Sequence, residues 1–319
     1  PQVTVMPRIG VSFPVTDQAL FFARYGKVAQ RPSSNSFSAL ASMSNSTGRI
    51  NNNALQPERT TEYEIGFRQR LTARSALTVS GFFRQIENLI QLDDLRESFP
   101  QGYSTYSNKD FGTVKGFEFD FDLRRTNNVA AKVNYTMSFA QGTGSASGTT
   151  STIVWIDETP PNFISPLDFD QRHTFNVSMD YRLGKGEGPS VGGTKLFENF
   201  GVNVLATASS GQPYTPQVEP FSQIDSKAPV PSGGINSARM PWKNRIDVRF
   251  DRKFSVGSRS TLSAFVWVQN LLDSQNTNGV YRATGLPDDD GYLATAGGQQ
   301  FLGSSVPVAE TLYRHRNRS

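Results

Sequence analysis

The sequence contains no cysteine and no long apolar run, and both absences narrow the classes of protein it can encode. Without cysteine the chain has neither disulfide bonds nor thiolate metal sites. No apolar run reaches the roughly 18 residues of a transmembrane helix. Only 36% of the 319 residues are hydrophobic and the mean hydropathy is −0.43, so a helical membrane protein is excluded. A membrane β-barrel stays possible, because alternating strands hide their lipid-facing side from a hydropathy window.

The sequence also lacks a strong charge bias and a signal peptide. Its 32 basic and 28 acidic residues are interspersed and leave a net charge of +4, so no nucleic-acid partner is expected. The chain opens with Pro1-Gln2-Val3, without a charged and apolar leader. It closes on a polar stretch, 313–319. We therefore expect residues 1–319 to be one portion of a longer protein.

What the sequence does contain is a regular alternation of short and long connections. Ten strand-like stretches run from about Pro7 to Asn276. The short connections lie near Thr16–Gln18, Ala73–Ser75, Thr126–Asn128, Gly184–Asn199 and Gly257–Ser260. The long connections are roughly Arg31–Thr60, Gln91–Gly112, Thr143–Gln171, Pro213–Lys243 and everything after Thr277. This rhythm predicts an all-β, antiparallel up-and-down meander of about ten strands, with turns at one end and loops at the other. Outer-membrane β-barrels have this asymmetry.

Apolar and charged residues alternate with a period of two in several stretches. In the fifth, Phe117, Phe119, Phe121 and Leu123 alternate with Glu118, Asp120, Asp122 and Arg124. The same pattern runs through 62–71, 174–183 and 245–251. Successive side chains of a strand point to opposite faces, so each stretch has one apolar and one charged side. Because a basic residue facing lipid costs about 2–4 kcal/mol at the midplane, we expect the charged side to line a water-filled lumen.

The alternation also predicts how neighbouring strands pair. An odd-length turn at Thr126-Asn127-Asn128 sets Asp122 opposite Lys132, Asp120 opposite Asn134 and Phe121 opposite Val133, which are favourable partners. The same reasoning around Ala73–Ser75 sets Leu71 opposite Leu77 and Ile65 opposite Phe83.

Aromatic residues near strand ends are candidates for the girdles of a barrel at the membrane interfaces. They include Phe82, Phe83, Tyr135, Phe139, Tyr181, Phe254 and Trp267. Alternation by itself fits a soluble β-sandwich equally well, since its polar face also meets water. The placement of all long loops at one end favours the barrel.

Five segments of the sequence resemble motifs of one known family. Leu55–Phe67 (LQPERTTEYEIGF), Val114–Glu118 (VKGFE) and Val268–Asn276 (VQNLLDSQN) resemble the "L-x-P-E-x-T-x-x-Y-E-x-G", "KGxE" and "NLFDxxN" segments of TonB-dependent outer-membrane receptors. Asp168–Thr174 (DFDQRHT) and Val280–Leu293 (VYRATGLPDDDGYL) resemble its Oar-like branch, whose members carry a carboxypeptidase-regulatory-like domain. Together the motifs extend over nearly the whole chain in the family's order.

The resemblance implies a 22-stranded transmembrane barrel in the Gram-negative outer membrane, plugged by an N-terminal domain. It implies import of an extracellular solute driven by the TonB complex through that plug, with outer-membrane lipid around the barrel. The plug, the TonB box and the closing strand are absent from this sequence. We therefore expect residues 1–319 to be the C-terminal portion of the barrel.

Single residues of the motifs have physical interpretations of their own. Pro57 lacks a backbone donor, which suits the end of a loop. Gly66, Gly81 and Gly116 indicate bulges or a close approach of other backbone, such as the plug. Asn270 and Asn276 are expected to bind backbone at a strand end and to initiate a turn.

No residue pattern predicts catalysis, a metal site or a cofactor. His173, with Arg172, Asp168 and Asp170, is interpreted as a loop-to-strand anchor of hydrogen bonds and ion pairs, against a metal or acid–base cluster. The remaining motifs carry no chemistry either. Asp288-Asp289-Asp290-Gly291 lacks the later residues of an EF-hand, so at most a loosely held surface calcium would bind there. Asp93 and Asp94 lie in a loop without a fixed partner, which does not support a pair of catalytic carboxylates, and Gly184–Gly188 is interpreted as a flexible turn. His315 and the glycosylation-like Asn45-Ser46-Thr47 indicate no function.

The sequence assigns no residue to substrate binding. The loop aromatics, interpreted as packing rather than stacking on a ligand, are Trp155, Phe163, Tyr214, Phe221 and Trp242. We predict that the chain forms the barrel of a receptor that binds and imports a solute, and that the protein is not an enzyme. The alternatives are a passive porin-like or adhesive outer-membrane barrel and a secreted carbohydrate-binding sandwich.

Overall fold

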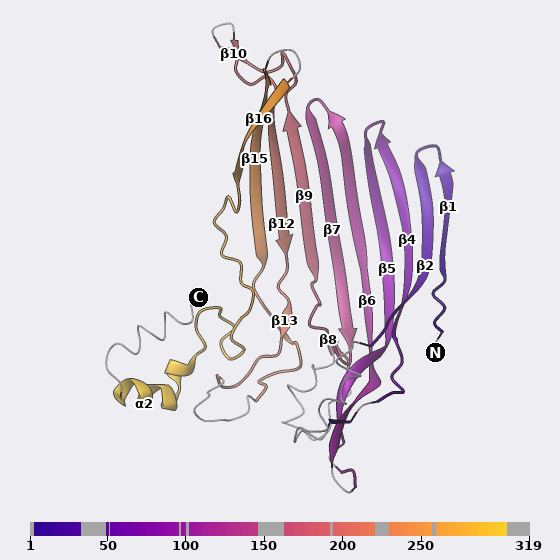
Figure 1. Cartoon of the computed structure of the whole chain (residues 1–319), viewed down its shortest axis with the longest axis vertical. Coiled ribbons are helices and arrows are strands. Elements are labelled where there is room, and N and C mark those ends of the chain that lie inside the picture. The colour runs from indigo at the N-terminus through magenta and orange to yellow at the C-terminus, as the bar shows by residue number, and fades with distance from the viewer. Residues whose placement is uncertain are drawn as a thin grey trace.

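One antiparallel sheet of ten consecutive strands dominates the computed structural model (Figure 1). The structure describes residues 3–32, 49–50, 52–95, 97–99, 102–145, 163–191, 194–220, 230–256 and 260–304. The ten strands are β1 (Arg8–Thr16), β2 (Ala19–Gln30), β4 (Glu58–Thr72), β5 (Ser75–Leu95), β6 (Tyr103–Thr126), β7 (Val129–Gly142), β9 (His173–Arg182), β12 (Phe200–Ser209), β15 (Lys243–Val256) and β16 (Ser260–Val268). Each pairs with the next along the chain, so the predicted meander is confirmed.

Shorter strands lie in the connections between these ten strands, and helical segments follow β16. They are β3 (Arg49–Ile50), parallel to β6; β8 (Ser165–Pro166), beside β7; the pairs β10 (Ser190–Val191) with β11 (Thr194–Lys195) and β13 (Pro213–Tyr214) with β14 (Ala238–Arg239); the 3-10 helix η3 (Tyr292–Ala294); and the helix α2 (Ala296–Ser304). None of the helices in the described ranges has the length and apolar character needed to cross a membrane.

Short and long connections gather at opposite ends of the sheet, as expected. In Figure 1 the short ones lie at the top and the long ones at the bottom. We call these the turn end and the loop end. One expected long loop is wrong: most of Gln91–Gly112 is strand, because β5 runs to Leu95 and β6 begins at Tyr103. The segment after Thr277, expected as loop, contains η3 and α2.

Three hairpins at the turn end share one construction. Thr16, Thr72 and Thr126 each precede a two-residue turn, and each hairpin has a register shift on the strand before it. The Oγ1 of Thr16 accepts the amide of Gln18, and that of Thr72 accepts the amide of Arg74, both at 3.2 Å. The two turn residues and the one extra residue of the register shift together act as an odd-length turn. Apolar residues of one strand therefore lie opposite apolar residues of the next.

This construction decides which predicted registers hold. Between β6 and β7, Asp122 lies opposite Lys132, Asp120 opposite Asn134 and Phe121 opposite Val133, so the prediction is confirmed. Asn127 and Asn128 have φ values of 47° and 73°, the signs that a type I′ turn requires.

Between β4 and β5 the predicted register is wrong by two residues. Leu77 lies opposite Gln69 rather than Leu71, and Ile65 lies opposite Gly81 rather than Phe83. The turn is Ala73-Arg74, closed by a 2.7 Å hydrogen bond between the hydroxyls of Thr72 and Ser75. Leu71 has no partner in the ladder because the register shifts between Arg70 and Thr72, and this extra residue, together with the shorter turn, moves the pairing by two positions from the predicted one.

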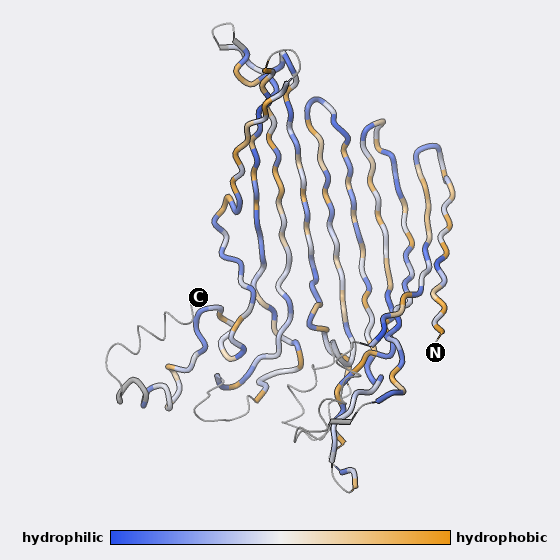
Figure 2. Tube along the Cα trace, viewed as in Figure 1, coloured by the Kyte–Doolittle hydropathy of each residue, from blue (hydrophilic) through white to orange (hydrophobic). Residues whose placement is uncertain are grey.

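Each face of the sheet has the side chains that the alternation predicts, and Figure 2 shows the alternation along the strands. The apolar face stays exposed: Ile65 is 60% exposed, Phe117 51% and Val266 62%. The described strands form one layer, so the Phe-rich sides are not buried in the dry core that a sandwich requires. The secreted-sandwich alternative is therefore wrong.

The aromatic residues expected to form a girdle do not all lie on one face of the sheet. By register, Phe83, Phe139 and Tyr135 share the apolar face, where the rings of Tyr135 and Phe175 stack at 4.3 Å. Phe82 and Trp267 lie on the charged face instead, opposite Gly116 and Arg249. Burial is concentrated at the loop end, at Leu55, Ile90, Ala140 and Leu167.

The strand glycines make room for neighbouring aromatic rings and, at Gly116, for neighbouring backbone. A Cβ on Gly66 would lie 2.2 Å from the ring of Phe22, and one on Gly116 would lie 2.7 Å from the ring of Phe82 and 2.2 Å from the Met137 carbonyl, so the expected close approach of other backbone is confirmed at Gly116, with β7 as that backbone. In both cases the phenylalanine comes from the neighbouring strand and covers the glycine directly opposite. The expectation of bulges at these positions is wrong, since the register runs unbroken through them.

Candidate functional site

The charged face of the sheet forms a polar wall with ion pairs between its strands. Arg24–Glu64 at 3.2 Å and Arg84–Glu62 at 2.7 Å join neighbouring strands, and Arg182–Asp251 at 2.9 Å joins β9 to β15 across β12. Exposed pairs of this kind contribute little stability, about 0–1 kcal/mol each. Their effect is to present fixed groups of both signs to water along the strands.

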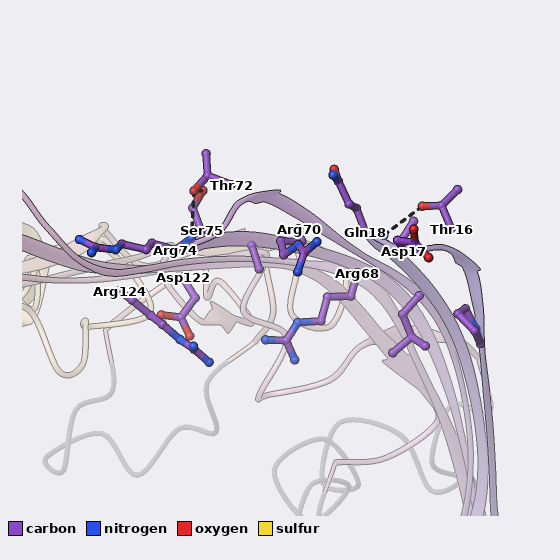
Figure 3. A pocket seen from close by; sticks show the side chains of 15 residues that line it. Thr16, Asp17, Gln18, Arg68, Arg70, Thr72, Arg74, Ser75, Asp122 and Arg124 are labelled. Atoms are coloured by element: carbon purple, nitrogen blue, oxygen red, sulfur yellow. Dashed lines mark hydrogen bonds between the residues drawn. The ribbon is translucent and has the colours of Figure 1, made fainter.

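An arginine cluster lies at the turn end of the wall. An open cavity of about 470 Å³ is lined there by Arg68, Arg70, Arg74 and Arg124, with Asp122 among them. In Figure 3, Arg68, Asp122 and Arg124 point to the concave side of the curved sheet. Arg68, Arg70 and Arg124 form no ion pair with the residues that the structure describes. This part of the wall therefore has a positive potential that favours anionic groups.

At the loop end, a buried carboxylate ties several strands together. Asp170 is fully buried; its Oδ1 accepts the amide of Ala140 at 2.8 Å, and its Oδ2 accepts Nε of Arg172 at 3.1 Å. Nη2 of Arg239 donates to the same Oδ2, and Nη1 of Arg239 donates to the Asp170 carbonyl at 2.8 Å. The guanidinium of Arg172 also lies over the ring of Phe139, 4.5 Å from its centroid. We call Asp170, Arg172 and Arg239 the rim knot.

Neighbouring residues of the same motif extend the rim knot. The side-chain amide of Asn236 donates to Asp168 at 2.7 Å and to the carbonyl of Pro166 at 2.8 Å. The side-chain amide of Gln171 donates to the carbonyl of Ser210, just past β12. Residues 168–173 therefore link β7, β9, β12 and β14, as an anchor should.

His173 was expected to contribute to the ion pairs of that anchor, but its side chain does not. Its backbone carries anchoring hydrogen bonds with Ser210, but the ion pairs are made by Asp170 and its arginines. The imidazole lies in an aromatic stack between Tyr135 and Trp242, with Nδ1 2.9 Å from the Tyr135 hydroxyl. Within the described ranges no group of three acidic or histidine residues could hold a metal ion.

The Leu55–Glu58 segment is a second anchor at the loop end. Asn108 joins it to β5 and β6, because its Oδ1 accepts the amide of Gln56 and its Nδ2 donates to the carbonyl of Asn88. Asn88 has a φ of 60° where the β5–β6 ladder shifts register. Glu58 accepts the amide of Ile90 at 3.1 Å, next to that shift. The motif residues therefore stabilise an irregularity in the longest hairpin.

The Val268–Asn276 segment is a third anchor, and its asparagines bind backbone as predicted. Oδ1 and Nδ2 of Asn276 exchange two hydrogen bonds with the backbone of Asn244, at 2.8 and 2.7 Å. Asn270 has a φ of 51° and closes a turn to Ser274, while its amide donates to Asp247.

The hairpin of β5 and β6 projects beyond the other strands at the loop end. Phe99, near its tip, is 98% exposed, so it is available to a ligand. Asp93 pairs with Lys109 across this hairpin, so the expectation that Asp93 has no fixed partner is wrong. Sequence reasoning missed the extension, although Ile90 and Leu92 alternate with the polar residues Gln91 and Asp93 as in a strand.

The other sequence candidates contribute packing or turns. Trp242 stacks on His173, and the Tyr214 hydroxyl lies against Gly285. Phe163 is exposed. The carboxylates of Asp289 and Asp290 accept the amides of Gly291 and Tyr292, which occupies them with the turn. Trp155, Phe221, His315 and Asn45–Thr47 lie outside the described residues.

At the turn end, the glycine-rich connection after β9 is held by Glu187. Its Oε2 accepts the amide of Gly184 and the side-chain amide of Asn128, each at 2.7 Å. These two hydrogen bonds, the first above all, hold the pKa of Glu187 below its ordinary value. The expected flexible turn therefore has a definite anchor.

The described side chains do not bring an acid, a base and a nucleophile together in one cavity. They form a mixed-charge wall, a positive region at the turn end and an anchored rim at the loop end. Such an arrangement can line a passage and contact a solute.

Comparisons with known proteins agree with this arrangement. Residues 2–271 match the family model described as TonB dependent receptor-like, beta-barrel. No curated protein matches the chain. The outer membrane transporter YddB from Escherichia coli has a similar fold, with a TM-score of 0.58, 13% identity, and coverage of 83% of this chain and 36% of that one.

Two further solved structures share the fold at low identity. The pyoverdine outer membrane receptor FpvA from Pseudomonas aeruginosa PAO1 has a TM-score of 0.58 and 14% identity, covering 84% of this chain and 32% of that one. The ferric-catecholate import receptor Fiu from Escherichia coli K12 has a TM-score of 0.52 and 16% identity, covering 84% and 30%. The chain spans about a third of the length of these structures. Because the family model covers most of the sequence, this chain belongs to the TonB-dependent receptor-like β-barrel family of Gram-negative outer-membrane proteins.

Proposed function

We propose that residues 1–319 form the C-terminal portion of the barrel of an Oar-like TonB-dependent receptor that binds and imports an extracellular solute. Members of the family import solutes such as siderophores. The observation that carries the proposal is the continuous polar wall on the concave face, bordered at the loop end by an anchored rim. A solute passing through the barrel would meet fixed charges of both signs along this wall.

The motifs at the rim support the Oar-like branch and the C-terminal position. The DFDQRH segment forms the rim knot, and the NLLDSQN segment anchors the chain after β16. β1 and β16 each have one edge without a partner among the described strands, and a barrel wall needs neighbours on both edges. A position within a larger barrel supplies them.

The proposed partners follow from the family. TonB would act through an N-terminal plug domain, and the solute would bind at the loop end, which is extracellular in this family. Two of the similar structures are described as bound to pyoverdine and as a ferric-catecholate import receptor, which supports an organic chelate as one class of solute. The proposed activity is transport without catalysis, with no resident cofactor.

Conductance separates energised import from the passive porin alternative. The full-length receptor, purified in detergent and inserted into a planar bilayer, should stay closed to ions under a modest voltage because a plug fills its lumen. Solute uptake by cells should disappear in a strain without TonB. A large steady conductance, together with uptake that persists without TonB, would assign the passive barrel instead.

A further inference from the structure

An apolar groove with a basic residue at its end lies on the outward face of the barrel. The groove has a volume of about 450 Å³ and is lined by Tyr63, Gly81, Phe83, Phe117 and Phe139, with Lys115 at the level of Phe83. Phe83, Lys115 and Phe139 occupy one row across three strands. Ile65, Gly81 and Phe117 form the next row toward the turn end.

Gly81 creates the groove. Its neighbours in that row, Ile65 and Phe117, are large, so the missing side chain leaves a furrow between them. A Cβ at Gly81 would meet the Phe117 ring at 3.5 Å, an ordinary contact, so the backbone does not demand glycine there. The space is open to the membrane side and has the apolar lining that suits an alkyl chain.

The depth of the groove in the membrane follows from the strand geometry. From the row of Tyr63 to Leu71 at the turn end, β4 advances eight residues, which is about 20 Å along the membrane normal at a rise of about 3.3 Å and a tilt near 40°. The outward apolar band of such barrels is about 25 Å tall. The Tyr63 row therefore lies at the extracellular interface, where lipid headgroups meet the acyl region.

The charges at this level are mainly positive. Lys115 is exposed and forms no ion pair with the described residues, and a lysine at an interface extends its ammonium group toward the headgroups. Lys27 lies one row further toward the loop end on the same face. Two rows beyond Tyr63 toward the loop end, Arg59 lies opposite Glu87 on the neighbouring strand, and the opposite charges of these two residues offset each other.

We propose that this groove is a binding site for a phosphate-bearing lipid of the outer leaflet. One acyl chain lies in the furrow over Gly81, and the phosphate meets the ammonium group of Lys115. Lys27 adds attraction at the same depth. This site depends on the membrane placement of the sheet and is independent of solute import, so either proposal can fail alone.

Native mass spectrometry of the full-length receptor in a neutral detergent tests the site. Lipid A is the probe; phosphatidylcholine supplies acyl chains without net negative charge, and inorganic phosphate supplies the anion without a chain. Lys115→Gln should lower the fraction of receptor that retains lipid A by about fivefold, as expected for one basic residue near a lipid headgroup. Gly81→Val, which fills the furrow without changing the charge, should lower it as well.

A matched control separates the site from general lipid contact. Lys132→Gln removes a lysine from the concave face, opposite Asp122, and should leave lipid A retention unchanged. Phosphatidylcholine should be retained weakly and equally by all variants. Equal retention of lipid A by the parent protein and Lys115→Gln would overturn the proposal, and so would competition by inorganic phosphate at low concentration. If Gly81→Val does not fold, the comparison of Lys115→Gln with Lys132→Gln still decides.

Discussion

Removing the carboxylate of Asp170 should loosen the loop end of the barrel without unfolding its strands. In the rim knot, this one side chain accepts the amide of Ala140 and pairs with both Arg172 and Arg239 while being fully buried. Asp170→Ala leaves two guanidinium groups without their partner and one buried amide without an acceptor.

The size of the effect follows from the burial of each partner. Breaking a buried ion pair costs about 3–5 kcal/mol. Arg172 and Arg239 are 31% and 29% exposed, so water replaces part of the lost interaction. The lost bond to Ala140 adds to the cost, because its amide is buried. We expect a local cost of about 3 kcal/mol, which corresponds to roughly a 100-fold change in an opening equilibrium.

Amide hydrogen exchange on the detergent-solubilised receptor measures this opening. The Ala140 amide should exchange about 100-fold faster in Asp170→Ala, while amides in the middle of β7 keep their protection. Asp168→Ala is the matched control, since Asp168 is exposed and accepts a hydrogen bond from Asn236; its effect should stay near 1 kcal/mol or less. An unchanged Ala140 exchange rate in Asp170→Ala would refute the rim knot as an anchor.

Three further predictions concern the strands and turns. Gly116→Ala should lower the thermal midpoint of the folded barrel, because its Cβ would lie 2.2 Å from the Met137 carbonyl; Gly81→Ala should not. Asn127→Ala should cost about 1 kcal/mol in refolding titrations, since its φ is positive, whereas Asn127→Gly should be neutral. The lowered pKa of Glu187 stabilises its turn above pH 4.5; protection of the Gly184 amide should fall as pH drops through the lowered pKa, but not in Glu187→Gln.

The sequence was sufficient for the faces and the order of the strands. Successive side chains of a strand point to opposite faces, so Phe117 and Glu118 lie on different faces whatever the conformation of the loops. The register between β6 and β7 followed from matching charges and faces. The register between β4 and β5 did not, because the bulge at Leu71 has no apolar or charge signature.

The rim could not be predicted from sequence because its contacts join residues far apart in the chain. The Asp170–Arg239 pair is separated by 69 positions, and the Gln56–Asn108 contact by 52. Neither partner carries a local pattern that identifies the other. The motifs at 55–58, 168–173 and 270–276 stand out in the sequence only through their resemblance to the family. In the structure, each of them joins a connection to the strands beside it through hydrogen bonds.

The central claim is that the apolar face of the sheet contacts lipid while the charged face lines a wet interior. Single cysteines can be placed along β4 of the full-length receptor and spin-labelled in a bilayer, and residues 1–319 add no cysteine of their own to the labelling. Labels at Ile65 and Phe67 should be accessible to oxygen dissolved in the lipid, and labels at Glu64 and Arg68 to a water-soluble nickel complex. Equal accessibility of both sets, or oxygen preference at Glu64 and Arg68, would contradict the account.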